Sequence, residues 1–381
     1  MPTETAPTDR TSRTDWVAVA KELVPIFASR AAGHDADDTF VADNYADLRR
    51  RRVFSAAVPT ELGGGGASPA QMCEVLRTLA RACSSTALAL AMHTHQVLVP
   101  AWRWRHEGAP VESMLRRLAA DEVIVASSGG SDWLTGSGRA ERVEGGYRVT
   151  ARKIFASGSP AADLFSTMAV YDDPADGPTV LHFLIPFDAP GVRIHDNWVT
   201  LGMRATGSHD VTLDGVFVPD TALGTRRPSG RWSHAWHIVV ANALPTVYSV
   251  YVGVAESARD TALRLAERRR DDRAVQEMVG AMDTDLTAAR LAWRSMVDAA
   301  GRGRVGPDVT NEVMIGRTLV GHAVLRAVEA AMEVAGGAGF FRAAGLERLF
   351  RDVQGARYHA LRGPAQRLFA GRLALGLDPN E

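Results

Sequence analysis

The sequence predicts a mainly α-helical protein with a central β-domain: an N-terminal helical domain, a middle antiparallel β-barrel and a C-terminal four-helix bundle. Three observations lead to this prediction. Apolar residues recur at helical spacing from Trp16 to about Ala120, alternate over the next hundred residues, and return to helical spacing from Trp232. A chain of 381 residues is also long enough for two or three compact units. The predicted bounds are a disordered tail at 1–14, then domains at 15–121, 122–222 and 223–381.

The N-terminal domain contains stretches of helical periodicity at 17–32, 40–59 and 69–102. TELGGGGASPA, at 60–70, is predicted to be a loop, because four consecutive glycines oppose regular structure. Such a loop can bind phosphate, but this one does not connect a strand to a helix, so a plain connector is favoured.

The middle domain is predicted from alternating apolar residues and turn signals. Because no helical stretch interrupts the strands, an antiparallel barrel or sandwich is expected. The predicted strand stretches are 122–128, 138–158, 164–172, 179–186, 191–199 and 209–219.

The C-terminal domain is predicted from long segments of helical spacing, as in a bundle. They cover residues 236–270, 274–301, 309–337 and about 346–375.

Composition excludes several classes of partner. The chain carries 43 basic and 44 acidic residues, so no charge surplus attracts nucleic acid or an anionic membrane. The N-terminus lacks an apolar signal region, and no uninterrupted run of about 18 apolar residues occurs. Cys73 and Cys83 lie ten residues apart in a helical pattern, which suits neither a disulfide framework nor a metal site. We expect a cytoplasmic protein whose partners are small molecules or copies of itself.

Three stretches together resemble the acyl-CoA dehydrogenase superfamily of flavoenzymes. They are GYRVTARKIFASGSPAADLF (146–165), LGMRATGSHDVTLDGVFVPD (201–220) and MEVAGGAGFFRAAGLERLFRD (332–352). The resemblance extends over nearly the whole chain. It implies FAD or FMN as cofactor, a homotetramer or homodimer, and the helix, barrel and bundle architecture predicted above.

Several residues match flavin-contacting positions. Phe155 and Ser157 stand two residues apart at a predicted strand end, so both are expected on one face. The resemblance implies that Phe155 packs on the flavin ring and that Ser157 hydrogen-bonds near flavin N5. It also implies that Ser127 or Ser128, in the turn SSGGSD, touches the flavin. An ordinary strand end with a capping serine is the alternative.

Gly336, Gly337 and Arg268 match positions that the superfamily places near the FAD of a neighbouring subunit. Glycine permits close approach of backbone NH groups to a ligand, although glycines at a helix end are also common structurally. Arg268 lies where dehydrogenases carry Arg-x-x-Phe-Gly, but Phe-Gly is missing here. Arg268 either meets phosphate or belongs to a solvated helix end. Arg351 and Asp352 are expected to form a structural ion pair.

The catalytic carboxylate of the dehydrogenases is missing. A dehydrogenase removes a proton next to the acyl carbonyl with a carboxylate base. The position matching this base lies near Ala360, and no Asp or Glu occurs between Asp352 and Asp378. A second location used by some relatives corresponds to Ala243 and Leu244.

These departures resemble the two-component flavin-dependent monooxygenases of the superfamily, which receive reduced flavin from a separate reductase and react it with O2. In that branch a histidine often stands where dehydrogenases have glutamate, and RDVQGARYHAL resembles that context. The resemblance implies that His359 is the acid/base or hydrogen-bonding group, together with Ser157 near N5. A histidine beside a helix without chemistry is the alternative.

His93, His95 and Trp236 are further candidates for the substrate pocket. The two histidines are two positions apart on a predicted helix and so face different sides; the resemblance implies that one of them faces the substrate. Trp236 is a candidate wall for an aromatic substrate, with core packing as its alternative. No metal site is expected, because no third ligand stands at suitable spacing.

We therefore predict a flavin-dependent oxidoreductase, a monooxygenase acting on a small organic substrate, with a flavin reductase as possible partner. One alternative is an acyl-CoA dehydrogenase with a relocated base, supported by Lys153 before the aromatic residue. Another is an inactive flavin-binding paralogue that acts as a subunit.

Overall fold

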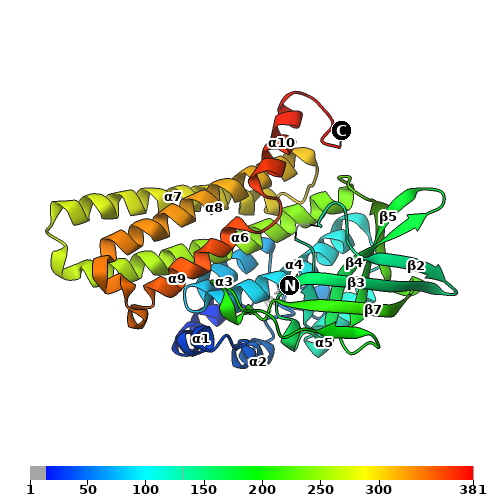
Figure 1. The fold of residues 1–381 in the computed structure, drawn as a ribbon, viewed down its shortest axis with the longest axis horizontal. Helices are drawn as coiled ribbons and strands as arrows, with labels where there is room; N and C mark the ends of the chain where they lie inside the picture. The colour runs from blue at the N-terminus through cyan, green and yellow to red at the C-terminus, as the bar shows by residue number, and fades with distance from the viewer. Residues whose placement is uncertain (1–13, 131, 381) are drawn as a thin grey trace, which may run out of the picture.

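A computed structural model describes residues 14–130 and 132–380, so the predicted tail at 1–14 lies almost entirely outside the described residues. Helices occupy one end of the molecule and the sheet the other (Figure 1). The order of helical domain, central sheet and helical bundle confirms the predicted fold class.

The N-terminal domain consists of five α-helices rather than three long segments. The second stretch forms a helix over only nine residues, and the third is broken around Ala82. Ser68 caps α3 in a capping box with Gln71, which explains where that helix begins. The helices are α1 (Trp16–Ala36), α2 (Ala42–Arg50), α3 (Pro69–Ala80), α4 (Ser84–Glu107) and α5 (Glu112–Asp121).

The glycine loop is a connector. The amides of Gly64, Gly65 and Gly66 donate to the carbonyls of Pro59, Ser55 and Val58. A phosphate cradle needs amides that are free to donate to the ligand, and these are engaged within the loop.

The central domain is one eight-stranded sheet in the order β6-β7-β3-β2-β4-β5-β8, with β1 paired to β4. Five strand pairs are antiparallel, but β1 and β2 both pair with β4 in parallel, which differs from the antiparallel prediction. The sheet also extends to Pro228, beyond the predicted boundary at 222. The strands are β1 (Val125–Ser127), β2 (Arg139–Val143), β3 (Gly146–Ala156), β4 (Leu164–Asp173), β5 (Gly177–Pro186), β6 (Val192–Ile194), β7 (His209–Pro219) and β8 (Leu223–Pro228).

The bundle is built on α6, α7 and α8, which lie alongside one another in Figure 1. The predicted last helix is wrong as a single element, because the chain leaves helical structure after a 3-10 turn at Gln354–Arg357. The break carries His359 out of the helix. The helices are α6 (His234–Ala266), α7 (Arg273–Gly301), α8 (Pro307–Ala335), α9 (Leu346–Val353) and α10 (Gly363–Ala374).

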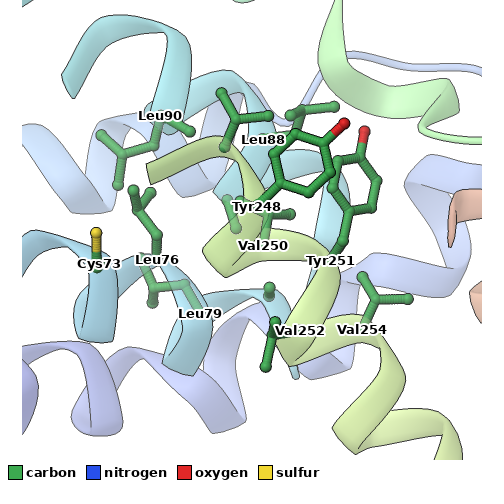
Figure 2. Close-up of a cluster of buried hydrophobic side chains, with 14 of the residues drawn as sticks. Cys73, Leu76, Leu79, Leu88, Leu90, Tyr248, Val250, Tyr251, Val252 and Val254 are labelled. Atoms are coloured by element: carbon green, nitrogen blue, oxygen red, sulfur yellow. The ribbon is translucent and has the colours of Figure 1, made fainter. Parts of the chain in front are cut away.

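Two clusters of buried apolar side chains hold the fold. The larger joins the N-terminal helices to the bundle, and the smaller lies within the sheet. Tyr248 and Tyr251 of α6 belong to the larger cluster, and in Figure 2 their hydroxyls point away from Leu76 and Leu79. Packing in this core therefore holds the rings of both tyrosines, while their hydroxyls point away from Leu76 and Leu79.

Helix α6 is the core of the bundle. The segment His234–Arg269 is long and apolar enough to cross a membrane by length and composition, but 94% of its most apolar window is buried within the fold. Polar residues such as Asn242, Thr246 and Ser249 interrupt the segment, so it is not an uninterrupted apolar run. Its apolar surface packs against the rest of the protein.

Candidate active site

One cavity of about 460 Å³ lies where the three domains meet. Helix α4, the loop after β1, the end of β3, strands β4, β5 and β8, helix α6 and the loop after α9 all contribute side chains. Seven of the residues proposed from the sequence line it: Ser127, Ser128, Phe155, Ser157, His95, Trp236 and His359.

Phe155 lines the cavity in an unusual backbone conformation. Its φ is +60°, which is rare for a bulky residue, and its side chain is 49% exposed. The register of β3 shifts between Lys153 and Ala156, so Ser157 falls beyond the strand. The sequence argument that alternation puts Phe155 and Ser157 on one face is therefore wrong, although both line the cavity. Trp198 meets the Phe155 ring edge-on at 5.2 Å.

Ser157 belongs to a chain of hydroxyl groups that the sequence analysis missed. Its Oγ lies 2.7 Å from Ser208 Oγ, which lies 2.6 Å from Thr206 Oγ1. Thr206 donates to the carbonyl of Met203 at 2.9 Å. Since that carbonyl only accepts, the three hydroxyls orient one another in series. The signal was present in the stretch T-G-S, but only the fold brings it to Ser157.

Ser127 ends β1, Ser128 follows it, and both line the cavity. Ser128 Oγ is 2.6 Å from Thr167 Oγ1, and both residues line the cavity. Gly129 follows with φ +123°, where a Cβ would come within 2.9 Å of Met168. Hydroxyl and amide groups are thus held close to an apolar wall.

His359 is held between α6 and α8. Its Nε2 lies 2.6 Å from Tyr251 Oη. Arg317 donates to the His359 carbonyl, and Tyr248 donates to the carbonyl of Ala356 at 2.9 Å. Burial, and to a lesser extent the Arg317 charge, lower the pKa of His359 to about 3. The imidazole is therefore neutral near pH 7.

The proton of His359 can be assigned from its partner. Burial raises the pKa of Tyr251 well above its ordinary value of 10, so the phenol keeps its proton. The contact alone permits either direction; we infer that Tyr251 donates to Nε2, because among the described residues its hydroxyl has no other acceptor. A neutral imidazole carries one proton, which then sits on Nδ1. His359 offers an Nδ1–H donor.

His93 does not line the cavity, whereas His95 does. His93 Nε2 donates to the Phe54 carbonyl at 2.9 Å, and Nδ1 accepts from the Val125 amide at 3.0 Å. It joins α4 to the start of β1. His95 Nδ1 donates to the Ala91 carbonyl, and Nε2 contacts Gln96 Nε2 at 2.8 Å. Burial lowers the pKa of each to about 4.

Gly336, Gly337 and Arg268 lie away from the cavity. Gly336 caps the end of α8 with φ +58°, and the neighbouring Arg269 donates to the Val334 carbonyl at 2.6 Å. Arg268 is exposed after α6. A role for these residues at a flavin requires a second copy of the chain.

Arg351 and Asp352 do not pair with each other, which corrects the sequence expectation. Arg351 binds Asp35 at 2.5 Å and Glu347 at 2.7 Å. Asp352 is buried and accepts from the Ser84 hydroxyl and the Met203 amide. Adjacent residues on a helix point in different directions, so each meets its own partners.

None of the described residues that line the cavity is a carboxylate. Ala243, Leu244 and Ala360, which match the two base positions of dehydrogenases, all contribute to the lining. The positions are therefore where the resemblance implies, but their side chains cannot take a proton.

The cavity suits a flavin. An exposed aromatic ring and Ile154 at 58% exposure offer a flat apolar surface, and the serine hydroxyls offer polar contacts at its edge. An isoalloxazine combines a flat aromatic body with carbonyl and ring-nitrogen edges, so Phe155, Ser127, Ser128 and Ser157 fit it. The left-handed backbone of Phe155 is a local cost consistent with a functional position.

Comparison with known proteins identifies the family of the chain. Residues 17–108, 126–216 and 243–364 match the N-terminal, middle and C-terminal domains of acyl-CoA dehydrogenase. Amino sugar nitrososynthase RubN8 of Streptomyces rubradiris is 30% identical over 353 residues, covering 88% of this chain and 83% of the relative. Dibenzothiophene monooxygenase of Rhodococcus erythropolis is 25% identical over 390 residues, covering 92% and 90%.

A solved structure of KijD3 in complex with FMN and dTDP-3-amino-2,3,6-trideoxy-4-keto-3-methyl-D-glucose has the same fold. It superimposes with a TM-score of 0.86 at 29% identity, covering 98% of this chain and 95% of KijD3. Flavin-dependent oxygenating enzymes and nitrososynthases thus stand among the relatives. This chain belongs to the acyl-CoA dehydrogenase family and is a flavin-dependent oxidoreductase.

Proposed function

We propose that the protein is a monooxygenase that uses reduced flavin and O2 on a small organic substrate. One observation carries this proposal: the described lining of the cavity contains no carboxylate, although it includes both positions where dehydrogenases place their base. A desaturase without a base lacks the group that removes the substrate proton. An oxygenase does not need that base.

Bound reduced flavin would supply the electrons that activate O2. The protein contributes the surroundings: Phe155 supports the ring, and the hydroxyls of Ser127, Ser128 and Ser157 bind its polar edge. Ser157 is oriented by Ser208, so its hydroxyl keeps one direction. The apolar wall formed by Met92, Val239, Leu244 and Val247 excludes water from the substrate side.

His359 acts as a neutral hydrogen-bond donor. With its pKa lowered to about 3, it does not carry a second proton at neutral pH. The Nδ1–H assigned above is available to an oxygen atom of the reacting groups, while Tyr251 holds the other nitrogen. In this role the His359 imidazole must be correctly oriented, but it does not need to gain or lose a proton.

FMN fits the chain better than FAD. The arginines where dehydrogenases bind the FAD adenosine are engaged or solvated: Arg269 donates to a helix-end carbonyl and Arg270 pairs with Glu267 at 3.0 Å. A separate reductase supplies the reduced flavin in this proposal. Comparison of FMN and FAD affinities by calorimetry tests the choice.

An oligomer is supported by exposed apolar side chains on the bundle. Leu291 of α7, Leu319 of α8 and Leu368 of α10 are 61%, 53% and 65% exposed. Apolar groups on an outer helical surface commonly mark an interface between subunits. We propose a homodimer or homotetramer in the cytoplasm, where the free thiols of Cys73 and Cys83 stay reduced.

Stopped-flow spectroscopy tests the monooxygenase proposal. The protein is loaded with FMN, reduced without oxygen and mixed with aerated buffer. We expect a transient absorbing species distinct from both reduced and oxidised flavin, which decays about tenfold faster in His359→Ala. Direct reoxidation, together with bleaching of the oxidised flavin by an acyl-CoA without oxygen, would instead establish a dehydrogenase.

An inactive paralogue would retain flavin and show neither reaction.

Lys153, which favoured a dehydrogenase, does not line the cavity. Its side chain is fully buried in the β-domain, and Nζ donates to the Ser137 carbonyl at 2.7 Å.

A further inference from the structure

A buried cation lies at one end of the cavity and has no carboxylate partner. Arg227 of β8 is 3% exposed and lines the cavity. Among the described residues, no Asp or Glu oxygen lies within 4 Å of its guanidinium. Arg226, its neighbour on the same strand, points outward and pairs with Asp173 at 2.6 Å. Burial of an uncompensated charge is costly, so Arg227 is unusual.

Neutral groups hold the Arg227 guanidinium in place. It donates to the carbonyls of Leu134, Trp133 and Pro228, to Met168 Sδ at 3.8 Å and, through Nε, to His182 Nε2 at 3.0 Å, so what it offers a ligand is chiefly its charge. The nearest acid, Asp132, accepts from Ser137 Oγ and lies 3.7 Å from Lys153 Nζ. With two cations and one carboxylate, this corner carries a net charge of about +1 near pH 7.

The charge persists at neutral pH although burial lowers the pKa of Arg227 to about 10. His182 remains neutral, because burial, and then the nearby Arg227 and Lys153 charges, lower its pKa to about 3. Its Nε2 accepts from Arg227, so its proton sits on Nδ1. No described residue accepts from that Nδ1–H.

A second donor in this corner also lacks an acceptor. Trp236 of α6 is 4% exposed, lines the cavity, and its Nε1 has no partner in the described part of the chain. The Arg227 guanidinium lies over the Trp236 ring at 4.7 Å, and the His182 ring meets it edge-on at 5.7 Å. Buried N–H groups in folded proteins nearly always have an acceptor, so this N–H stands unsatisfied within the described residues.

The rest of this wall is apolar, with Met168, Val239 and Leu244 in the lining. A ligand that matches both features has an apolar body and one anionic, hydrogen-bond-accepting end. We propose that His182, Arg227 and Trp236 form a subsite for the carboxylate of an organic acid substrate. The assignment of this ligand as the substrate rests on the proposed function; its binding does not.

Calorimetry with benzoate and its neutral isostere benzamide tests the subsite, using the full-length protein without added flavin and again with oxidised FMN. We expect benzoate to bind at least about tenfold more tightly than benzamide, since hydrogen bonds to charged groups are the strong ones. Arg227→Met is expected to abolish this preference. Arg226→Met, the matched control on the same strand, is expected to leave it unchanged.

Two further variants keep the test decisive if Arg227→Met does not fold, as judged by circular dichroism. Trp236→Phe keeps an aromatic ring but removes the indole N–H, and should weaken benzoate binding severalfold with little effect on benzamide. Arg227→Lys keeps the charge and should retain part of the preference for benzoate.

Equal affinities for benzoate and benzamide in the wild type would overturn the proposal. It would also be overturned if Arg227→Met weakened reduced FMN selectively while benzoate affinity stayed the same, because the charge would then serve the flavin. Both measurements are made without turnover. A negative monooxygenase assay would therefore not contradict the carboxylate subsite, and a negative binding result would not contradict the monooxygenase proposal.

Discussion

Tyr251 Oη and His359 Nε2 lie 2.6 Å apart, joining the first helix of the bundle to the loop where dehydrogenases carry their base. The tyrosine is fully buried, and Gly355 leaves room for it, since a Cβ there would come within 2.6 Å of the hydroxyl. With Tyr251 as the donor, this contact places the imidazole proton on Nδ1. Several predictions depend on such pairwise relationships.

Tyr251→Phe is expected to remove the hydrogen bond that favours one tautomer of His359. The Nδ1–H form then competes with the Nε2–H form, and the transient species should decay about tenfold faster while FMN affinity stays within about twofold. Carbon and nitrogen NMR shifts of His359 report the tautomer directly. Tyr248→Phe is the matched control, because its hydroxyl bonds the Ala356 carbonyl instead. An unchanged His359 spectrum in Tyr251→Phe would show that the phenol does not select the tautomer.

Phe155→Gly should separate stability from cofactor binding. Glycine adopts φ +60° without strain, so we expect the free energy of unfolding of the flavin-free protein to stay constant or rise by about 1 kcal/mol. FMN affinity should fall about tenfold, because the ring surface is lost. Phe217→Gly is the comparison: Phe217 is 43% exposed on β7, and its replacement should destabilise without affecting FMN. Urea denaturation and calorimetry measure the two effects. Unaltered FMN binding in Phe155→Gly would exclude a ring contact.

Ser157→Ala removes the first hydroxyl of the chain that ends at the Met203 carbonyl. We expect a shifted absorbance maximum of bound FMN and a severalfold shorter lifetime of the transient species. Ser208→Ala leaves Ser157 in place but removes its partner, so the same changes should be smaller. Absorbance spectra and stopped-flow traces of the two variants provide the comparison. If the order of effects were reversed, Ser208 rather than Ser157 would be the group nearer the flavin.

Acid should destabilise the fold through buried neutral histidines. Burial lowers the pKa of His93 and His95 to about 4 in the folded protein, below the ordinary histidine pKa of about 6.5. Between these values the unfolded chain binds more protons, so stability falls as pH falls from about 6.5 towards 4. Each histidine should contribute about 2 kcal/mol of this loss between pH 7 and pH 5.

Urea midpoints at these two pH values, for wild type and His95→Gln, measure that loss. The variant should show a smaller difference between pH 7 and pH 5. Replacement of the exposed His322 by Gln is the control and should behave as the wild type. A pH-independent midpoint in the wild type would mean that these imidazoles are solvated or already charged.

Much of the architecture could be predicted because helical and alternating periodicities are local. These periodicities predict the β-domain and the helices before and after it. They do not predict where a long helical segment is interrupted. The third N-terminal segment breaks around Ala82 and the last one after Arg357, although their apolar patterns continue. At such places tertiary contacts, like those of Arg317 and Tyr248 with the 356–359 loop, outweigh local propensity.

The order of domains, the resemblance and the loss of carboxylates at Ala243, Leu244 and Ala360 could all be read from residue identities along the chain. The folded arrangement was needed to show that His95 rather than His93 lines the cavity and that Tyr251 contacts His359 Nε2. It alone assembled His182, Arg227 and Trp236 from three separate elements. Burial and hydrogen-bond partners set the charge and proton position of each group, and both are properties of neighbours in space.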